Sequence, residues 1–318
     1  MEMNNPLVSV CIPVYDQEKY VKRLLDSIVM QDYKNIEVIV SDDSPHHEIE
    51  NLCHQYEDKL SLRYFNHQPS LKTPKNWNFA LDKAVGDYIM LMHQDDFFAK
   101  QNSVSVYLNA FKENKNVQFV FSRNTPLYDN GETLPDFKRN KRIANNLKKN
   151  VDYLVNMYVI GPPSNVMITK DVTTRYDERF IWLVDVDYSV RTIDSGIKTF
   201  YIDEHLVTIG MHPEQTTVFC YENPEVMLRE NILYAQKRPA NVFKKMWVFD
   251  YFWRLIRNHK VKSVEDIIRT GVHPEEIITP IKDIIHAQEK YSYKTLRTGM
   301  FSKILMLKTL ILNKHKYI

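Results

Sequence analysis

The chain contains 318 residues, of which 44% are hydrophobic and 26% charged, and its formal net charge at pH 7 is +2. These values are typical of a globular protein and exclude a disordered chain, a collagen repeat and a coiled-coil rod. No apolar run approaches the length of a membrane-spanning helix, and we expect no secretory signal at the polar N-terminus. Three scattered cysteines are too few for a disulfide framework or a zinc site, so we expect a reducing, cytoplasmic setting.

The first part of the chain alternates predicted strands and helices. In chain order, short apolar runs predict strands and 3.6-residue periods predict helices. The strands are expected over 7–12, 36–40, 60–65, 88–92 and 117–121, and the helices over 20–30, 48–59, 76–84 and 103–113. This alternation predicts an α/β fold with a mostly parallel sheet flanked by helices.

The pattern changes after this alternation. Residues 124–150 are polar and rich in Lys and Asn, and we expect a surface loop or lid there. A short apolar run follows at 165–169. Helical periods then dominate, over 225–237, 240–258, 264–270, 275–290 and 294–312. We therefore divide the chain into an α/β part, 1–225, and a helical part, 226–318.

The small net charge conceals two parts of opposite sign. Residues 1–225 contain 24 Lys and Arg against 32 Asp and Glu, whereas residues 226–318 contain 18 against 8. An acidic part can provide metal sites, and a basic part favours anionic partners such as a membrane surface or nucleic acid. A solvated, Lys-rich helical surface explains the second part equally well.

Acidic pairs follow two of the predicted strands. Asp42 and Asp43 follow the second strand, and Asp95 and Asp96 follow the fourth. Ligands of parallel sheets bind at the carboxyl ends of the strands, and buried acidic pairs are costly unless a cation neutralises them. The alternative is that each pair caps the next helix. With 7 glycines in the chain, a glycine-rich phosphate loop is not expected, so a diphosphate would be held by metal and side chains.

Four stretches in order resemble glycosyltransferase family 2, whose members are inverting enzymes with the GT-A fold. They are the strand and Pro-Val-Tyr-Asp-Gln-Glu of 8–18, the strand ending in Ser-Asp-Asp-Ser at 36–44, the segment 78–97 with His-Gln-Asp-Asp, and 176–191 with Val-Asp-Val-Asp-Tyr and an arginine. The resemblance covers roughly 7–220 and is of the polysaccharide or O-antigen biosynthesis type. It implies a nucleotide-sugar-binding and catalytic domain over 1–225, with 226–318 contacting an acceptor or a membrane.

The resemblance assigns roles to individual positions. Asp185 would be the general base, with Asp187 as the alternative. Asp95 and His212 would bind Mn²⁺ or Mg²⁺. The donor sugar and diphosphate would contact Asp96, Lys75 and His93, and the nucleoside would contact Pro13, Tyr15, Glu18, Asp42 and Asp43.

The chain departs from the family pattern at several positions, among them Asp16, Ser44 and Pro45, and Trp77, which stands where many relatives have Arg, so that Lys72 or Lys75 would supply the charge there. Two further departures fall in the metal and base motifs. His93 stands where the first acid of the Asp-x-Asp signature is expected, and it would either ligate metal or serve a structural role. Val184 stands where a glutamate precedes the base, which is why Asp187 stays open as the base. The Gln-x-x-Arg-Trp motif of processive membrane synthases is absent.

The resemblance implies transfer of a sugar from a nucleotide-sugar, a UDP-sugar, to a saccharide acceptor, lipid-linked, in surface polysaccharide synthesis such as O-antigen or capsule. Two alternatives remain: a nucleotidyltransferase, and a non-catalytic module that binds a nucleotide-sugar or a membrane. Aromatic and basic residues alternate over 244–257, and 301–312 places two lysines among apolar residues. We expect a cytoplasmic protein, peripheral at the inner face of the membrane, and no nucleic-acid partner.

Overall fold

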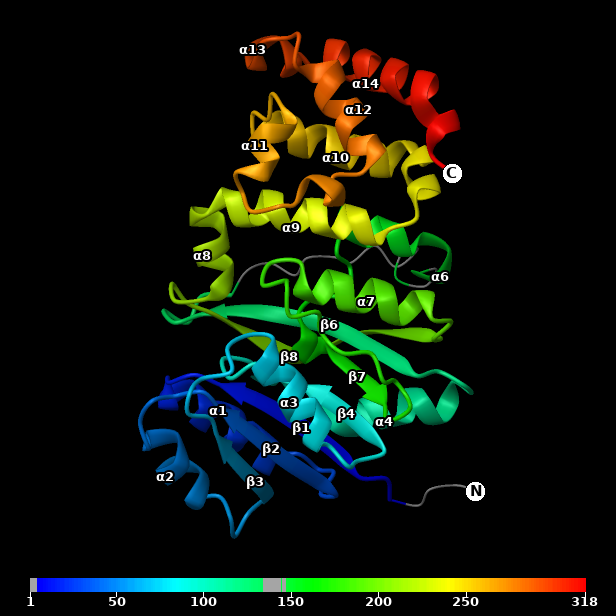
Figure 1. Cartoon of the computed structure of the whole chain (residues 1–318). Coiled ribbons are helices and arrows are strands. Elements are labelled where there is room, and N and C mark those ends of the chain that lie inside the picture. The colour runs from blue at the N-terminus through cyan, green and yellow to red at the C-terminus, as the bar shows by residue number, and fades with distance from the viewer. Residues whose placement is uncertain (1–4, 134–143, 145–146) are drawn as a thin grey trace. The chain divides into compact units, whose positions relative to one another are not determined.

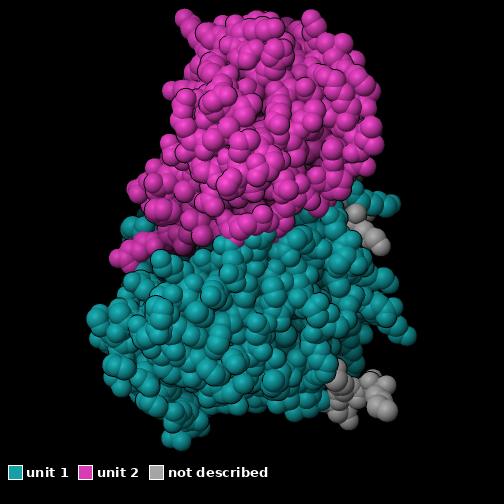
Figure 2. Space-filling view, in the orientation of Figure 1, with its two compact units in different colours: residues 1–151, 159–178, 188–213 teal, residues 152–158, 179–187, 214–318 magenta. Residues whose placement is uncertain are grey.

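The computed structural model describes residues 5–133, 144 and 147–318. Contacts divide the chain into two compact units, coloured separately in Figure 2. The first unit comprises 1–151, 159–178 and 188–213, and the second comprises 152–158, 179–187 and 214–318. The boundary predicted between 225 and 226 stays a prediction about domain organisation.

Among the described residues, the first unit is built on an eight-stranded sheet in the order β3-β2-β1-β4-β7-β6-β8-β5, whose strands other than β5 are labelled in Figure 1. Its strands are β1 (Val8–Val14), β2 (Ile36–Asp42), β3 (Ser61–Asn66), β4 (Tyr88–Leu91), β5 (Phe97–Phe98), β6 (Phe119–Tyr128), β7 (Val166–Thr169) and β8 (Thr199–Met211). Strands β3, β2, β1 and β4 are parallel, as are β6 and β8, whereas β7 and β5 pair antiparallel with their neighbours. The predicted α/β class is confirmed, with a mixed sheet that is parallel in its N-terminal half.

Helices cover the sheet because their apolar residues recur along one stripe. Helix α1 buries Val21, Leu24, Leu25 and Ile28, spaced three and four residues apart. Strand β1 is buried along its whole length, as expected for a strand in the middle of a sheet covered by helices. Among the described residues, the α-helices lying wholly in this unit are α1 (Glu18–Val29), α2 (Glu48–His54), α3 (Lys75–Lys83), α4 (Ser103–Glu113) and α6 (Leu147–Asn150).

The loop predicted over 124–150 is wrong at its start. Strand β6 continues to Tyr128, paired in parallel with β8, and the register shifts between Ser122 and Asn124. Polar residues such as Asn124 are tolerated because this part of the strand is half-buried. The rest of the predicted loop falls largely on 134–143 and 145–146, outside the described residues. Strand β8, which the sequence patterns missed, is the longest of the sheet.

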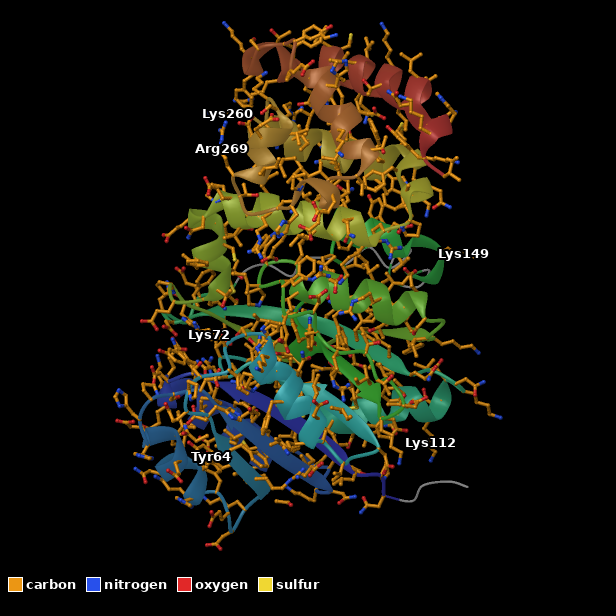
Figure 3. The ribbon with its side chains drawn as sticks, viewed as in Figure 1. Tyr64, Lys72, Lys112, Lys149, Lys260 and Arg269 are labelled. Carbon is orange, nitrogen blue, oxygen red and sulfur yellow. The ribbon has the colours of Figure 1, made fainter. Side chains whose placement is uncertain are left out.

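The second unit is helical, which confirms the predicted helical C-terminal region. Helices α10, α12 and α14 pack against one another. In Figure 3, Lys260 and Arg269 are labelled just after α10 and α11. The helices lying wholly in this unit are α8 (Thr216–Glu222), α9 (Pro224–Lys237), α10 (Met246–Asn258), α11 (Val264–Ile268), α12 (Thr279–Gln288), α13 (Tyr293–Leu296) and α14 (Gly299–Asn313).

The aromatic residues of α10 form the core of this second unit. Phe249, Phe252 and Trp253 are fully buried, and the indole N–H of Trp253 donates to Ser302 Oγ at 2.9 Å. Because these rings are inside the unit, the alternation over 244–257 reflects a helical core. Among the described residues, no helix is both long enough and apolar enough to cross a membrane.

Candidate active site

The most distinctive cluster of the first unit lies in the loop that follows β4. His93, Asp95 and Asp96 bring one ligand atom each to within 4.8 Å of one another. Asp95 and Asp96 are buried, and His93 is partly buried. The main-chain N–H of His93 donates to Ser164 Oγ at 2.9 Å, which anchors the start of the loop. The loop therefore gathers two carboxylates and an imidazole at the carboxyl end of a central strand.

Asp96 is held by the backbone of β8, and the hydroxyl of Ser164 acts on the same carboxylate. Its Oδ1 accepts the N–H of Gly210 at 3.1 Å, while its buried Oδ2 has no hydrogen-bond partner among the described residues and lies 4.0 Å from His93 Nδ1. Burial, with the neighbouring Asp95 charge, raises the pKa of Asp96 well above its ordinary value. A β-carbon at Gly210 would collide with the carbonyl oxygen of Asp95, so β8 approaches the loop as closely as a backbone can.

Asp95 pairs with a histidine that follows β8. His212 Nε2 lies 3.2 Å from Asp95 Oδ2, and the ring is buried. The ring of Tyr20 stacks on His212, and its hydroxyl donates to Asp129 at 2.6 Å. Beneath the loop, the guanidinium of Arg23 donates to the Asp95 carbonyl oxygen at 2.6 Å.

The donor set fits a divalent cation. Ten buried side-chain atoms of the described residues have no hydrogen-bond partner, and three of them belong to possible ligands of this cluster: Asp96 Oδ2, His93 Nε2 and His212 Nδ1. Unpaired buried polar atoms are costly and rare unless a ligand satisfies them. Two carboxylates with imidazole nitrogens suit Mn²⁺, whereas Mg²⁺ would use mainly the oxygens. Asp95 and His212, predicted to bind metal, therefore lie beside His93 and Asp96, predicted to contact the diphosphate, whereas Lys75 is not part of this cluster.

The second acidic pair is tied to protein groups. Asp42 is fully buried, and its carboxylate accepts hydrogen bonds from Ser44 and, at 2.7 Å, from the hydroxyl of Tyr64, labelled in Figure 3. Asp43 accepts the main-chain N–H groups of Leu71 and Lys72 at 2.9 and 2.8 Å. The Asp42 carboxylate thus stabilises the end of β2, and the Asp43 carboxylate stabilises the turn that leads into α3.

The segment after β1 presents its aromatic ring to solvent. Tyr15 is 58% exposed, while Pro13 is buried within β1. Gln94 accepts the N–H of Tyr15 at 2.7 Å and donates to its carbonyl oxygen at 3.1 Å, which links this segment to the loop after β4. Glu18 is exposed at the first position of α1. Lys75 is exposed at the first position of α3.

Both candidates for the general base lie in the first turn of α7 (Val184–Asp194), in the second unit. Asp187 is buried and forms an ion pair with Lys237. Asp185 is half-buried, and its Oδ1 accepts the N–H of Val186 at 2.8 Å. Burial raises the pKa of Asp185 to about 7, and the nearby charge of Glu230 adds to the rise.

Glu230 on α9 supports the start of α7. Its carboxylate accepts the N–H groups of Ile181, Trp182 and Leu183 at 2.8, 2.8 and 2.9 Å. Burial raises the pKa of Glu230 despite these three donors. The same carboxylate therefore fixes the backbone before α7 and raises the proton affinity of Asp185.

Sequence reasoning missed several residues that support the site. Tyr20 and Arg23 lie on one face of α1, where they are indistinguishable from ordinary positions of an amphipathic helix. Only its position between His93 and Asp95 could have indicated that Gln94 belongs to the site. No sequence pattern indicated Glu230, because it lies on a helix 45 positions after Asp185.

Comparisons with known proteins agree on one family. The family model described as "Glycosyl transferase family 2" matches residues 9–166. An uncharacterized glycosyltransferase of Methanocaldococcus jannaschii is 28% identical over 210 residues, covering 65% of this chain and 71% of that protein. An uncharacterized glycosyltransferase of Haemophilus influenzae is 29% identical over 48% of this chain, and the match spans 57% of its length.

Solved structures match over nearly the whole chain. Staphylococcus aureus TarS in complex with UDP has a TM-score of 0.59 at 17% identity, with 98% of this chain and 91% of that chain covered. A mannosyltransferase of Pyrobaculum calidifontis, in complex with GDP-Man and Mn²⁺, has a TM-score of 0.53 at 13% identity, with 98% of this chain and 76% of that chain covered. At these identities the likeness establishes a shared GT-A fold.

Proposed function

The chain belongs to glycosyltransferase family 2, and we propose that it transfers a sugar from a UDP-sugar to a saccharide acceptor with inversion at the anomeric carbon. The observation that carries the proposal is the cluster of His93, Asp95 and Asp96, which lies within the residues matched by the family model, beside His212. A buried acidic pair with unpaired atoms is poorly suited to stability alone, and well suited to a cation that accompanies a diphosphate.

On the donor side, Asp95, Asp96, His93 and His212 would hold Mn²⁺ or Mg²⁺. The bound ion would supply charge neutralisation for the departing nucleoside diphosphate. Lys75, exposed at the start of α3, is proposed to add a positive charge near the diphosphate. Two structural neighbours support this type of donor, since one was solved with UDP-GlcNAc and another with GDP-Man and Mn²⁺.

The nucleoside is proposed to lie against the segment after β1. The exposed ring of Tyr15 offers a face on which a base can stack. Pro13, Glu18, Asp42 and Asp43 complete the proposed nucleoside site. Because the carboxylates of Asp42 and Asp43 already accept protein hydrogen bonds, they would orient the surrounding backbone as well as meet the base and ribose.

Asp185 is proposed as the general base. The acceptor hydroxyl must lose a proton as it attacks the anomeric carbon, and a carboxylate with a pKa near 7 is matched to that task. Asp187 is the weaker candidate, because its ion pair with Lys237 already occupies the carboxylate. The proton would pass from the acceptor oxygen to Asp185 while the glycosyl bond to the diphosphate breaks.

The acceptor is proposed to be a lipid-linked saccharide of a surface polysaccharide, such as O-antigen or capsule, used at the cytoplasmic face of the membrane. The support is the basic composition of 226–318, which carries 18 Lys and Arg against 8 Asp and Glu. Anionic lipid or a lipid diphosphate would be attracted to such a charge balance.

The test is donor hydrolysis and transfer by the purified chain against a panel of UDP- and GDP-sugars, with and without Mn²⁺. We expect Mn²⁺-dependent turnover of a UDP-sugar that is lost in Asp95→Ala and retained in Asp58→Ala, which removes an exposed acid of the same unit. If Asp95→Ala is as active as the parent protein, the metal-site assignment is wrong. Turnover of GDP-sugars alone would correct the proposed donor.

A further inference from the structure

Helix α14 is apolar on two opposite faces. Its inner face is buried through Ser302, Met306 and Leu310, within the second unit. Its outer face is also apolar, because Met300, Ile304, Ile311 and Leu312 are exposed to 79%, 60%, 63% and 59% of their surface. Exposed apolar residues scattered singly are normal, but four on one helix face mark an interaction surface.

The spacing places these side chains together. Met300, Ile304, Lys308 and Leu312 follow one another at intervals of four, and Ile311 lies seven residues after Ile304, so all five share about half of the helix circumference. A surface helix in water would place polar residues along this face. The outer face of α14, defined as Met300, Ile304, Ile311 and Leu312, therefore has the composition of a face that meets an apolar phase or partner.

The surroundings of this face carry charge of one sign. Residues 290–318 contain seven Lys and Arg and no Asp or Glu. All seven are exposed: Lys290, Lys294, Arg297, Lys303, Lys308, Lys314 and Lys316. The Asp250 carboxylate on α10 lies 3.1 Å from the ammonium of Lys303 and so offsets part of that charge. Lys308 lies within the apolar row itself, where a long side chain can direct its ammonium to the surface while its carbons remain among apolar groups.

We propose that the outer face of α14 and its lysines form a surface that binds anionic lipid bilayers, with the helix lying in the interfacial plane. An exposed apolar stripe bordered by Lys and Arg is the pattern of helices that lie in the headgroup region. A protein partner would explain the stripe, but not why seven Lys and Arg surround it against two nearby acids, Asp250 beside Lys303 and Asp283, 3.9 Å from Lys316. The inference deepens the proposed action on a lipid-linked acceptor, because it names the surface that would hold the enzyme where such acceptors are found.

The test is flotation of the full chain with vesicles of phosphatidylcholine alone and of phosphatidylcholine with phosphatidylglycerol. We expect binding to the anionic vesicles, weakened by salt, and at least tenfold less binding to the neutral ones. The double variant Ile304→Glu, Ile311→Glu is expected to lose at least tenfold in binding. The matched control Val85→Glu, Met246→Glu alters two exposed apolar residues elsewhere and should bind like the parent.

Charge is tested in the same assay. The variant Lys308→Glu, Lys314→Glu should bind anionic vesicles at least tenfold more weakly, whereas Lys112→Glu, Lys149→Glu, whose positions are labelled in Figure 3, should retain binding. Circular dichroism and the melting temperature establish that each variant is folded. Equal binding to both vesicle types, or equal losses in the control variants, would overturn the proposal.

Two further outcomes separate the possible failures. A dimer in solution that dissociates in Ile304→Glu, Ile311→Glu, with no vesicle binding by the parent, would assign this face to a second copy of the chain and reject the lipid assignment. Donor hydrolysis measured without vesicles distinguishes the two proposals. Absent lipid binding with intact hydrolysis refutes only the membrane surface, and absent hydrolysis with intact binding refutes only the proposed transfer.

Discussion

The ring of Tyr20 stacks on the imidazole of His212, with centroids 4.9 Å apart and 22° between the planes. The Tyr20 hydroxyl is tied to Asp129, and His212 Nε2 faces Asp95. A helix residue outside the cluster thus fixes the orientation of a ring inside it. Groups that orient metal ligands without touching the metal commonly affect affinity by about 10- to 100-fold.

Tyr20→Ala is therefore expected to raise the Mn²⁺ dissociation constant by about tenfold, because the imidazole of His212 loses its stacking partner. Titration calorimetry of the donor-free protein measures this constant. Tyr20→Phe keeps the ring and should retain most of the affinity. Tyr33→Ala, which removes another half-buried tyrosine of the same unit, is the control and should leave Mn²⁺ binding unchanged.

Asp96→Asn is expected to raise the melting temperature of the metal-free protein at pH 7 by a few degrees. Burial and Asp95 raise the folded-state pKa of Asp96, so its ionised form costs stability at every pH above the ordinary carboxyl pKa of about 3.9. The amide removes that cost. Calorimetric scans in EDTA measure the melting temperature without metal. Scans in Mn²⁺ then measure the stabilisation by the ion, which should be smaller in the variant than in the parent. A variant that melts lower in EDTA and still gains the full Mn²⁺ shift contradicts the assignment.

Transfer activity is expected to rise with pH and level off above about 7. Asp185 must be ionised to accept a proton, and its pKa is raised to about 7, so kcat/KM should fall about tenfold per pH unit well below that value. Asp185→Asn should lower kcat by about 10²-fold or more while donor binding persists. The measurement is a pH profile of transfer with donor affinity determined separately.

Asp187→Asn separates the two candidate bases. The substitution breaks the ion pair between the buried Asp187 carboxylate and the partly buried Lys237 ammonium, so we expect a loss of about 3 kcal/mol in unfolding free energy. Below the melting transition the pH profile should keep its shape. If the Asp187→Asn protein is folded but inactive and the Asp185→Asn protein is active, Asp187 is the general base.

Glu230→Ala is expected to destabilise the protein by about 3 kcal/mol, because it leaves the N–H groups of Ile181, Trp182 and Leu183 unpaired. Glu230→Gln keeps an acceptor oxygen and should cost less. Urea unfolding measures both. The same substitutions remove a negative charge near Asp185, so the midpoint of the activity profile should move to lower pH in Glu230→Gln. An unmoved midpoint would show that burial alone sets the proton affinity of Asp185.

The N-terminal half of the sheet could be predicted because its strands are short apolar runs closed by polar turns. Asp42 and Asp95 follow buried strands, and the parallel topology brings such strand ends to one edge. Strand β8 escaped prediction because it carries Asp203, Glu204 and His205 within its length, and its pairing with the polar end of β6 is a tertiary effect. Likewise, the stacking of Tyr20 on His212 joins residues far apart in sequence, and no local pattern encodes it.

Gly210 lies in direct contact with the loop that carries His93, Asp95 and Asp96. Any side chain there would press on the Asp95 carbonyl oxygen and come within 3.0 Å of the Arg23 guanidinium, while the Gly210 N–H must still reach Asp96. The chain has 7 glycines, and this one sets the distance between strand β8 and the loop of Asp95 and Asp96. Side chains of the loop can therefore be exchanged in evolution without a clash with β8. A β-carbon at position 210, in contrast, would push the loop and its two carboxylates away from the strand.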